Sequence, residues 1–261
     1  MNDKKKRMMG GGASADISID GAIVAYDVGL GSSDSGLSTL TNLAQSGFNG
    51  SSSATGHSIQ GSGGARYMSI SNGSSHIDTA FNTGDFGVSA YTIYMVWKRN
   101  KHDGTFMFLW GNQNYGVGWD NVFAIEDLGS MFFRMYVYNK NTSNGSYLNV
   151  DTGSSTSSAF NRYAWNFTAI TFSNNSFARI YKCHNNGTVT LMAENTSPSG
   201  TRLYNTAHAS RMFCNPTTTS SNPWYGEWSH LSFWNTAHST TRIGQQFSSI
   251  KTRTSFSFDP W

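Results

Sequence analysis

Residues 225–233 read Tyr-Gly-Glu-Trp-Ser-His-Leu-Ser-Phe, and Trp234 and Asn235 follow directly. Alternation over this run predicts a β-strand, because successive side chains of a strand point to opposite faces of the sheet. Leu231 and Phe233 are then expected on one face, and Trp228 and His230 on the other. The aromatic residues of the run also favour a strand.

Residues 239–251 read Ser-Thr-Thr-Arg-Ile-Gly-Gln-Gln-Phe-Ser-Ser-Ile-Lys. Ile243, Phe247 and Ile250 have the spacing of one stripe on a helix. Either Ser239 or Thr240 can cap the first turn, while the basic residues 251 and 253 are favourable near the last turn. A helix this short is unstable alone, so we expect it to pack on a sheet that contains the preceding strand.

This order of elements resembles the closing signature of concanavalin A-like lectin/glucanase domains, the laminin-G-like jelly rolls. The matching motifs are Phe-Trp-Asn at 233–235, Ala-x-Ser at 237–239, Arg-Ile-x-Gln-x-Phe at 242–247 and Lys-x-Arg at 251–253. Further similar segments follow the family's order at 23–27, 40–43, 47, 91–98, 165–172 and 178–181. The resemblance covers roughly residues 20–255. It implies an all-β fold, an antiparallel jelly-roll β-sandwich with one short C-terminal helix.

The remaining sequence fits an antiparallel sandwich built from short strands. Aromatic residues make up 14% of the chain and charged residues 13%, and Gly, Ser, Thr and Asn are abundant between the apolar runs. We expect strands at 23–26, 67–70, 76–81, 91–99, 106–110, 122–125, 131–138, 147–150, 165–172, 177–182, 188–193 and 211–214. The 106–110 strand is expected to pair with 91–99, residues 173–176 to form a hairpin turn, and 29–66 to form a long loop. In the 91–99 strand, Ile93, Met95 and Trp97 are expected on the opposite face from Thr92, Tyr94, Val96 and Lys98.

The chain divides into a basic, glycine-rich arm at 1–16, a jelly-roll domain at 17–255 and a tail at 256–261. The net charge is +3, and the arm's basic residues 4–7 more than account for it. The nearly neutral domain lacks the basic face of a nucleic-acid-binding protein. No apolar run approaches the ~20 residues that span a bilayer, and no signal peptide is visible, so neither a membrane nor secretion is expected.

The sequence predicts no catalytic centre, cofactor or metal site. Retaining glucanases need two carboxyls about 5 Å apart, but Glu126 and Asp127 are adjacent, so on a strand they would point to opposite faces, and Glu227 stands alone. No Cys/His spacing of a zinc site occurs. Cys183 and Cys214 are expected to be buried free thiols, although a disulfide between them stays open.

A loop that follows the 106–110 strand has the composition of a carbohydrate-binding loop. Aromatic rings, amides and one acid alternate with glycines, at Trp110, Asn112, Asn114, Tyr115, Trp119 and Asp120. Sugars are held by stacking and by amide or carboxylate hydrogen bonds, and sites favour loops at a scaffold's rim. The alternative is a glycine-rich hairpin with packed Trp rings. Asp120 could join carbonyl groups in a weak calcium site.

Two functions follow from the resemblance and the residues. The first is a non-enzymatic structural protein of a bacteriophage virion, such as a capsid decoration, head-fibre or tail-associated subunit, made in the host cytoplasm. Its expected partners are other virion proteins and further copies of itself, without specific nucleic acid. The anchor would be the arm, through Lys4, Lys5, Lys6, Arg7, Met8 and Met9. The alternative is a carbohydrate-binding module that recognises glycans, including those of a host surface.

Overall fold

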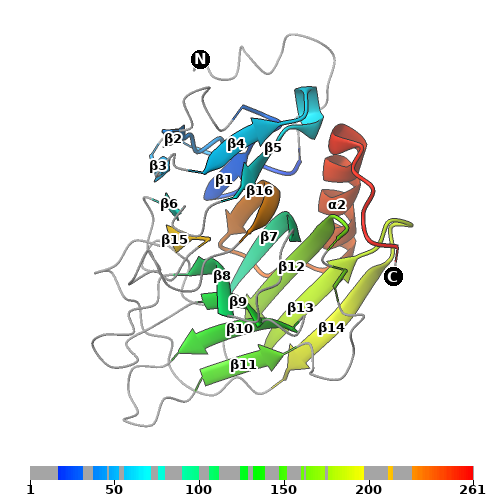
Figure 1. The fold of residues 1–261 in the computed structure, drawn as a ribbon. Helices are drawn as coiled ribbons and strands as arrows, with labels where there is room; N and C mark the ends of the chain where they lie inside the picture. The colour runs from blue at the N-terminus through cyan, green and yellow to red at the C-terminus, as the bar shows by residue number, and fades with distance from the viewer. Residues whose placement is uncertain are drawn as a thin grey trace.

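The computed structural model contains two stacked β-sheets and a C-terminal helix (Figure 1). It describes part of the chain. The described residues are 17–31, 38–45, 47–52, 56–71, 76–79, 90–99, 160–161, 163–173, 176–196, 211–213 and 225–260, with the backbone of strands at 106–111, 124–128, 132–138 and 147–151. The arm 1–16 and most of the predicted carbohydrate-binding loop lie outside these residues.

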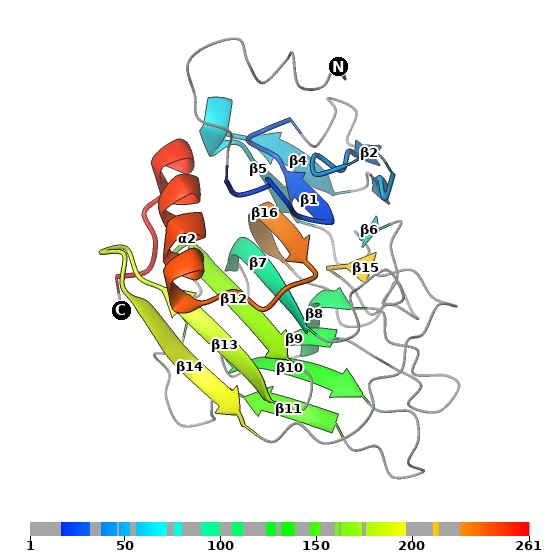
Figure 2. The ribbon, with the colours of Figure 1, turned by 180° about the vertical axis from the view of Figure 1, so that it is seen from behind.

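Sheet A has eight strands, seven of which run in the order β14-β13-β12-β7-β16-β5-β4. These strands are β4 (His57–Gln60), β5 (Tyr67–Ile70), β7 (Ala90–Arg99), β12 (Asn166–Ser173), β13 (Phe177–Cys183), β14 (Val189–Asn195) and β16 (Gly226–Trp234). An eighth strand, β1 (Val24–Asp27), pairs with the second half of β16, while β5 pairs with its first half. Figure 2 shows β1 beside β16 from behind. All of the described pairs are antiparallel.

Sheet B runs in the order β11-β10-β9-β8-β15-β6-β3-β2. Its strands are β2 (Thr39–Leu40), β3 (Gly50–Ser52), β6 (Ile77–Asp78), β8 (Phe106–Gly111), β9 (Ala124–Leu128), β10 (Phe132–Tyr138), β11 (Tyr147–Asp151) and β15 (Arg211–Met212). These pairs are antiparallel too. The sequence prediction of an antiparallel β-sandwich is therefore confirmed.

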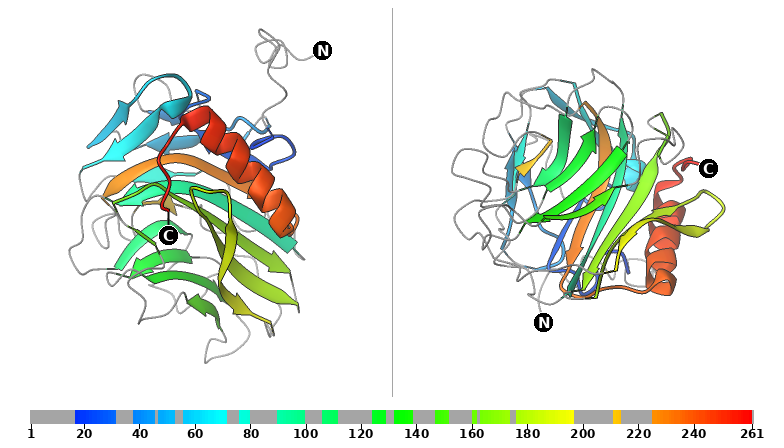
Figure 3. Two further views of the ribbon diagram at one scale, coloured as in Figure 1. Left: turned by 90° about the vertical axis from the view of Figure 1, so that its right-hand side faces the viewer. Right: turned by 90° about the horizontal axis from the view of Figure 1, so that it is seen from below.

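Helix α2 (Thr240–Thr254) covers the face of sheet A that points away from sheet B (Figure 3). Ile243, Phe247 and Ile250 are buried, as their spacing predicted. Ser239 is the N-cap, and its hydroxyl accepts a hydrogen bond from the Arg242 N–H. No helix of the described residues is both long and apolar enough to cross a membrane.

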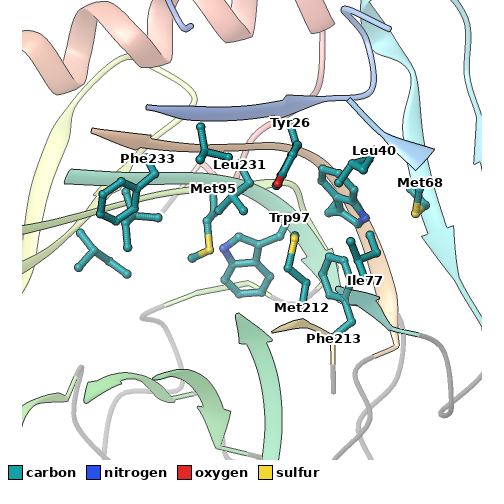
Figure 4. Close-up of a cluster of buried hydrophobic side chains, with 14 of the residues drawn as sticks. Tyr26, Leu40, Met68, Ile77, Met95, Trp97, Met212, Phe213, Leu231 and Phe233 are labelled. Carbon is teal, nitrogen blue, oxygen red and sulfur yellow. The ribbon is translucent and has the colours of Figure 1, made fainter. Parts of the chain in front are cut away.

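Sheet A consequently has an apolar core on each face. Between the sheets, side chains of β7, β15 and β16 gather in one cluster, in which Figure 4 labels Met95, Trp97, Met212, Leu231 and Phe233. Beneath α2, side chains of the opposite parity from β7 and β12 form a second cluster. The alternation predicted for β7 is confirmed, since residues 93, 95 and 97 belong to the first core and residues 94 and 96 to the second.

A β-bulge in β16 changes the face of the sheet to which the side chains of its first half point. Trp228 pairs with Trp97 of β7, but the next paired residue is His230, opposite Val96, so Ser229 is extra. Because an extra residue reverses the parity of a strand, Trp228 lies in the inter-sheet core together with residues 231 and 233. The prediction that Trp228 shares a face with His230 is therefore wrong.

Other local predictions fail for similar reasons of long-range pairing. Strand β8 does not pair with β7, because it lies in sheet B between β9 and β15. The segment 29–66, predicted as a loop, contains β2, β3, β4 and the 3-10 helix η1 (Gly63–Ala65). These strands are short and polar, so their apolar periodicity is weak. The hairpin between β12 and β13 is confirmed.

The segment after α2, predicted as a tail at 256–261, packs against sheet A. Phe258 is buried beneath the helix and forms a bridge to Trp165, just before β12. Lys182 on β13 donates to the Asp259 carboxylate at 2.6 Å, and both side chains are about 1% exposed. A buried pair of opposite charges needs good geometry to offset desolvation, and here it fixes residues 256–260 on the sheet.

Candidate functional site

A buried cluster of Asp27, His230 and Arg253 lies at the point where β16 exchanges β5 for β1. The Arg253 guanidinium donates to both Asp27 carboxylate oxygens, at 3.0 and 2.6 Å, and Nδ1 of His230 lies 2.7 Å from Oδ2. The Leu30 N–H also donates to this carboxylate. Burial alone would raise the pKa of Asp27, but the hydrogen bond from His230 and the Arg253 charge outweigh it and lower the pKa.

The hydrogen bonds continue from His230 to a serine hydroxyl. His230 Nε2 lies 2.9 Å from the Ser232 Oγ, which in turn accepts from the Trp234 indole N–H at 3.1 Å. A proton on Nδ1 lets His230 donate to Asp27, while its Nε2 accepts from the Ser232 hydroxyl. The order Ser–His–Asp has the connectivity of a hydrolytic triad, but both the serine and the histidine are fully buried. Without access for a substrate, this chain of hydrogen bonds stabilises the fold.

Two glycines let α2, η1 and the residues after β1 pack closely at this cluster. A Cβ atom on Gly64 would lie 2.5 Å from the Arg253 carbonyl oxygen, and one on Gly29 would lie 2.3 Å from the Gly64 carbonyl oxygen. Real side chains do not tolerate such distances, so both positions require glycine for close packing. The buried cluster therefore holds η1, β1 and α2 together.

The same three residue types meet a second time, on the outer face of sheet B, in what we call the outer cluster: His76, Asp78 and Arg211. Asp78 pairs directly with Arg211 across β6 and β15. Their neighbours Ile77 and Met212 are buried in the inter-sheet core, so alternation places Asp78 and Arg211 on the opposite face. The side chain of Asp78 is 40% exposed, that of Arg211 22% and that of His76 17%.

Electrostatic contacts hold the outer cluster together. The Arg211 Nε–H donates to Asp78 Oδ1, and Nε2 of His76 lies 3.5 Å from Asp78 Oδ2. Partial burial would raise the pKa of Asp78, but the hydrogen bonds from His76 and Arg211 and the Arg211 charge lower it. Asp78 is therefore ionised at neutral pH, and the cluster presents an anionic acceptor beside a cationic donor.

The outer cluster adjoins the end of β8, where the carbohydrate-binding loop predicted from the sequence begins. Arg211 also pairs with Gly111 of β8, and Met212 pairs with Trp110. On its other side Asp78 pairs with Ser51, an exposed residue of β3. The row Ser51–Asp78–Arg211–Gly111 thus joins four neighbouring strands of sheet B, and residues 112–121 follow Gly111 in the chain.

His57 lies beside the outer cluster at the edge of sheet A. Its Nδ1 lies 2.5 Å from the Ser52 hydroxyl of β3, which connects the two sheets, and its Nε2 is buried without a hydrogen bond in the described structure. Burial, with a smaller effect of the nearby His76, lowers the pKa of His57 to about 4. His57 is therefore neutral at physiological pH.

Only part of the predicted site can be placed. The backbone of Trp110 belongs to β8, whereas Asn112, Asn114, Tyr115, Trp119 and Asp120 lie outside the described residues, as do Lys4, Lys5, Lys6, Arg7, Met8 and Met9. The carbohydrate loop, its weak calcium site and the arm stay predictions. Sequence reasoning missed the outer cluster, although the alternation of 76–78 could have indicated that His76 and Asp78 share a strand face.

His238, Glu227 and Cys183 are also potentially reactive, and each lies in contacts that stabilise the fold. Nδ1 of His238 lies 2.7 Å from the Tyr94 hydroxyl oxygen. Burial, with a smaller effect of the Arg242 charge, lowers the pKa of His238 to about 4. Glu227 forms an ion pair with Lys98 at 3.2 Å. Cys183 is a buried free thiol whose pKa is raised by burial; Cys214 lies outside the described residues. No group of three or more potential metal ligands occurs in the described part of the chain.

Comparisons by sequence give no relative for this chain. No protein-family model matches it, and no curated protein matches it.

Comparisons by structure find solved proteins that share the fold. The botulinum neurotoxin serotype C1 binding domain superposes with a TM-score of 0.60 at 14% identity, covering 90% of this chain and 53% of that one. Another botulinum neurotoxin type C structure gives 0.60 at 13% identity, covering 91% and 53%. Trypanosoma rangeli sialidase in complex with sialic acid gives 0.59 at 12% identity, covering 89% and 33%. The chain thus spans about half the length of the neurotoxin chains and a third of the sialidase chain. At these identities the likeness establishes the fold alone.

Proposed function

We propose that this protein is a carbohydrate-binding domain whose binding face is the outer side of sheet B around His76, Asp78 and Arg211. The observation that carries the proposal is the row from Ser51 to Gly111, which places an ionised acid and a guanidinium together on the outer face. The same row leads directly into the aromatic and amide-rich segment 112–121.

The chemistry of the outer cluster suits sugar hydroxyl groups. A sugar hydroxyl both donates and accepts hydrogen bonds, so an acceptor such as Asp78 next to a donor such as Arg211 can hold two neighbouring hydroxyls. An ion pair between them fixes both side chains before the ligand arrives, which lowers the entropy cost of binding. The sheet supplies a rigid base, as ligand sites on scaffolds require.

The structural neighbours add support of a second kind. Botulinum neurotoxin type C depends on interaction with two ganglioside molecules to enter cells, and the sialidase holds sialic acid. Both proteins contain this fold and both handle glycans. The outer cluster suits such a ligand, because Arg211 can donate to the carboxylate of an acidic sugar and His76 lies beside it.

A glycan array followed by calorimetric titration tests the proposal. The wild-type protein is screened against neutral and sialylated oligosaccharides, and the best ligand is titrated into wild type, Arg211→Ala and Arg179→Ala. Arg179 is a matched control, since it forms an ion pair with Glu194 at the edge of sheet A. We expect Arg211→Ala to weaken binding about tenfold or more while Arg179→Ala changes nothing. Absence of array binding, or equal binding by both variants, would contradict the proposal.

A role on a bacteriophage virion is the second part of this proposal and rests on the sequence resemblance. The arm 1–16 would attach the domain to a larger assembly, in several copies, and leave the outer cluster facing host glycans. Deletion of residues 2–12 should abolish incorporation into particles and leave the domain's thermal stability unchanged. Wild-type occupancy by the truncated protein would rule out this role for the arm.

A further inference from the structure

The polar row on the outer face of sheet B continues past the outer cluster on the side away from β8. Ser51 of β3 pairs with Asp78, and Thr39 of β2 pairs with Ser51 (Figure 1). Leu40 and Ile77 are buried in the inter-sheet core, so alternation places Thr39 on the same outer face as Asp78. Both Thr39 and Ser51 are exposed. The row across these four strands is Thr39–Ser51–Asp78–Arg211.

The two hydroxyl groups of this extension are available to a ligand. Neither Thr39 nor Ser51 uses its side chain in a hydrogen bond within the described part of the chain. A hydroxyl group both donates and accepts hydrogen bonds, as the hydroxyl groups of a sugar do. Both side chains are small and uncharged. The extension therefore suits a neutral sugar unit and supplies no charge that would attract an acidic one.

The backbone that carries these hydroxyl groups is tied to both sheets. Strand β3 lies between β2 and β6 in sheet B. The Ser52 N–H donates to the Ser38 carbonyl oxygen at 3.2 Å, and the Ser52 hydroxyl lies 2.5 Å from Nδ1 of His57 in sheet A. A serine hydroxyl turns about one torsion with three staggered positions, and a threonine is stiffer still. The hydroxyl oxygens of Thr39 and Ser51 are thus confined to few positions, which lowers the entropy cost of binding.

The direction and length of the row match a linear oligosaccharide. Neighbouring strands of a sheet lie about 4.8 Å apart, so the row from Thr39 to Arg211 spans about 14 Å. One pyranose unit of a linear chain advances by a length close to one strand spacing. A unit held at Asp78 and Arg211 can therefore place the next unit over Ser51, and the unit after it over Thr39.

We propose that Ser51 and Thr39 form two further sugar subsites, so that the binding face takes a linear neutral oligosaccharide of three units that lies across the strands. This inference rests on the proposed function, because Asp78 and Arg211 hold the first unit through its neighbouring hydroxyl groups. Each further subsite adds a neutral hydrogen bond, which strengthens binding about threefold to tenfold. The extension thereby selects for ligand length, whereas the outer cluster provides the first contact.

The dependence of affinity on ligand length tests the two subsites. The probes are cello-, chito- and β-galacto-oligosaccharides of one to four units, screened on the array and then titrated calorimetrically. For a series that binds, we expect wild type to gain about tenfold or more from one unit to three. Ser51→Ala and Thr39→Val should each weaken trisaccharide binding about threefold or more and leave monosaccharide binding unchanged. Ser248→Ala, on the exposed side of α2 across the molecule, is the matched control and should change neither.

The outcomes distinguish failure of the subsites from failure of the proposed function. Arg211→Ala should weaken binding of every length alike, and absence of all array binding contradicts the proposed function itself. Array binding that depends on Arg211 but is equal for one and three units, or that includes none of the three series, would overturn the subsites alone. A length gain that survives in both Ser51→Ala and Thr39→Val would also overturn them and place the further units beyond Arg211. Each variant is first checked for an unchanged thermal unfolding transition, as expected for exposed hydroxyl groups.

Discussion

The fold uses Asp, His and Arg in two clusters that differ mainly in burial. Asp27 and His230 are completely buried beneath α2, and Arg253 is 15% exposed, so the Asp27 carboxylate has its charged and hydrogen-bonding partners within the protein. The outer cluster keeps the same chemistry at a surface, with Asp78 40% exposed. The comparison teaches that residue types alone do not define a site, because solvent access decides whether a polar cluster stabilises the fold or meets a ligand.

The largest effect on stability is expected from Asp27→Ala. This change leaves the Arg253 charge and the buried His230 without their acceptor, and breaking a buried charged pair costs about 3–5 kcal/mol. Chemical denaturation of the purified variant measures the free energy of unfolding. A loss below about 1 kcal/mol, the size of an ordinary surface effect, would show that the buried cluster does not hold α2 to the sheet.

A smaller loss is expected from Gly64→Ala, which tests how closely α2 approaches η1. The new Cβ would lie 2.5 Å from the Arg253 carbonyl oxygen and 2.7 Å from the Arg253 Cγ. Overpacking of this kind costs about 1–3 kcal/mol. Gly187→Ala is not a suitable control because of its positive φ angle, but Gly244→Ala is, since its Cβ would meet only Val189 at 3.6 Å. Equal stability of both variants would place α2 farther from η1.

The pH dependence of stability should separate the two regions. The lowered pKa of Asp27 means that its contribution is present above its ordinary pKa of 3.8 and is lost only as the pH falls toward its folded pKa. His57 near the outer cluster titrates earlier: its pKa is 6.5 when unfolded and about 4 when folded, so the unfolded chain binds more protons between these values. Stability should therefore fall as the pH drops from 6.5 to 4.

Unfolding experiments across this range measure the effect, whose slope is at most about 1.4 kcal/mol per pH unit for one histidine. His57→Asn should reduce the slope, and His238→Asn should reduce it as well because burial also lowers the pKa of His238 to about 4. An unchanged slope in both variants would contradict the assignment of neutral, buried imidazoles.

The sequence was sufficient where local periodicity is strong. The helix stripe at 243, 247 and 250 and the alternation of β7 follow from residues close together in the chain, and both are confirmed. The predicted face of Trp228 is wrong because the extra residue Ser229 reverses the alternation of the strand. Nothing local in the aromatic run indicates where a bulge occurs. The prediction that β8 pairs with β7 is wrong because the partners of β8 depend on the arrangement of the whole sandwich and not on local sequence.

The candidate site shows the same limit more clearly. Asp78 and Arg211 are separated by 133 residues, and only the pairing of β6 with β15 brings them together. Both strands are two residues long, which is too short for a periodic signal. The segment that follows Gly111 in the chain could be recognised from its aromatic and amide composition, but the pairing of Gly111 with Arg211 required the sheet register.

The smallest effect on stability, and the most direct test of the comparison, is expected from Asp78→Asn. A partly exposed ion pair contributes less than about 1 kcal/mol, and asparagine preserves the shape of the side chain. Calorimetric titration of the best array oligosaccharide into wild type, Asp78→Asn and the matched control Glu194→Gln provides the measurement. The account predicts a loss of about tenfold in affinity for Asp78→Asn alone, because the charged acceptor is removed. Equal affinity of all three proteins for this oligosaccharide would contradict the assignment of the outer cluster as the binding face.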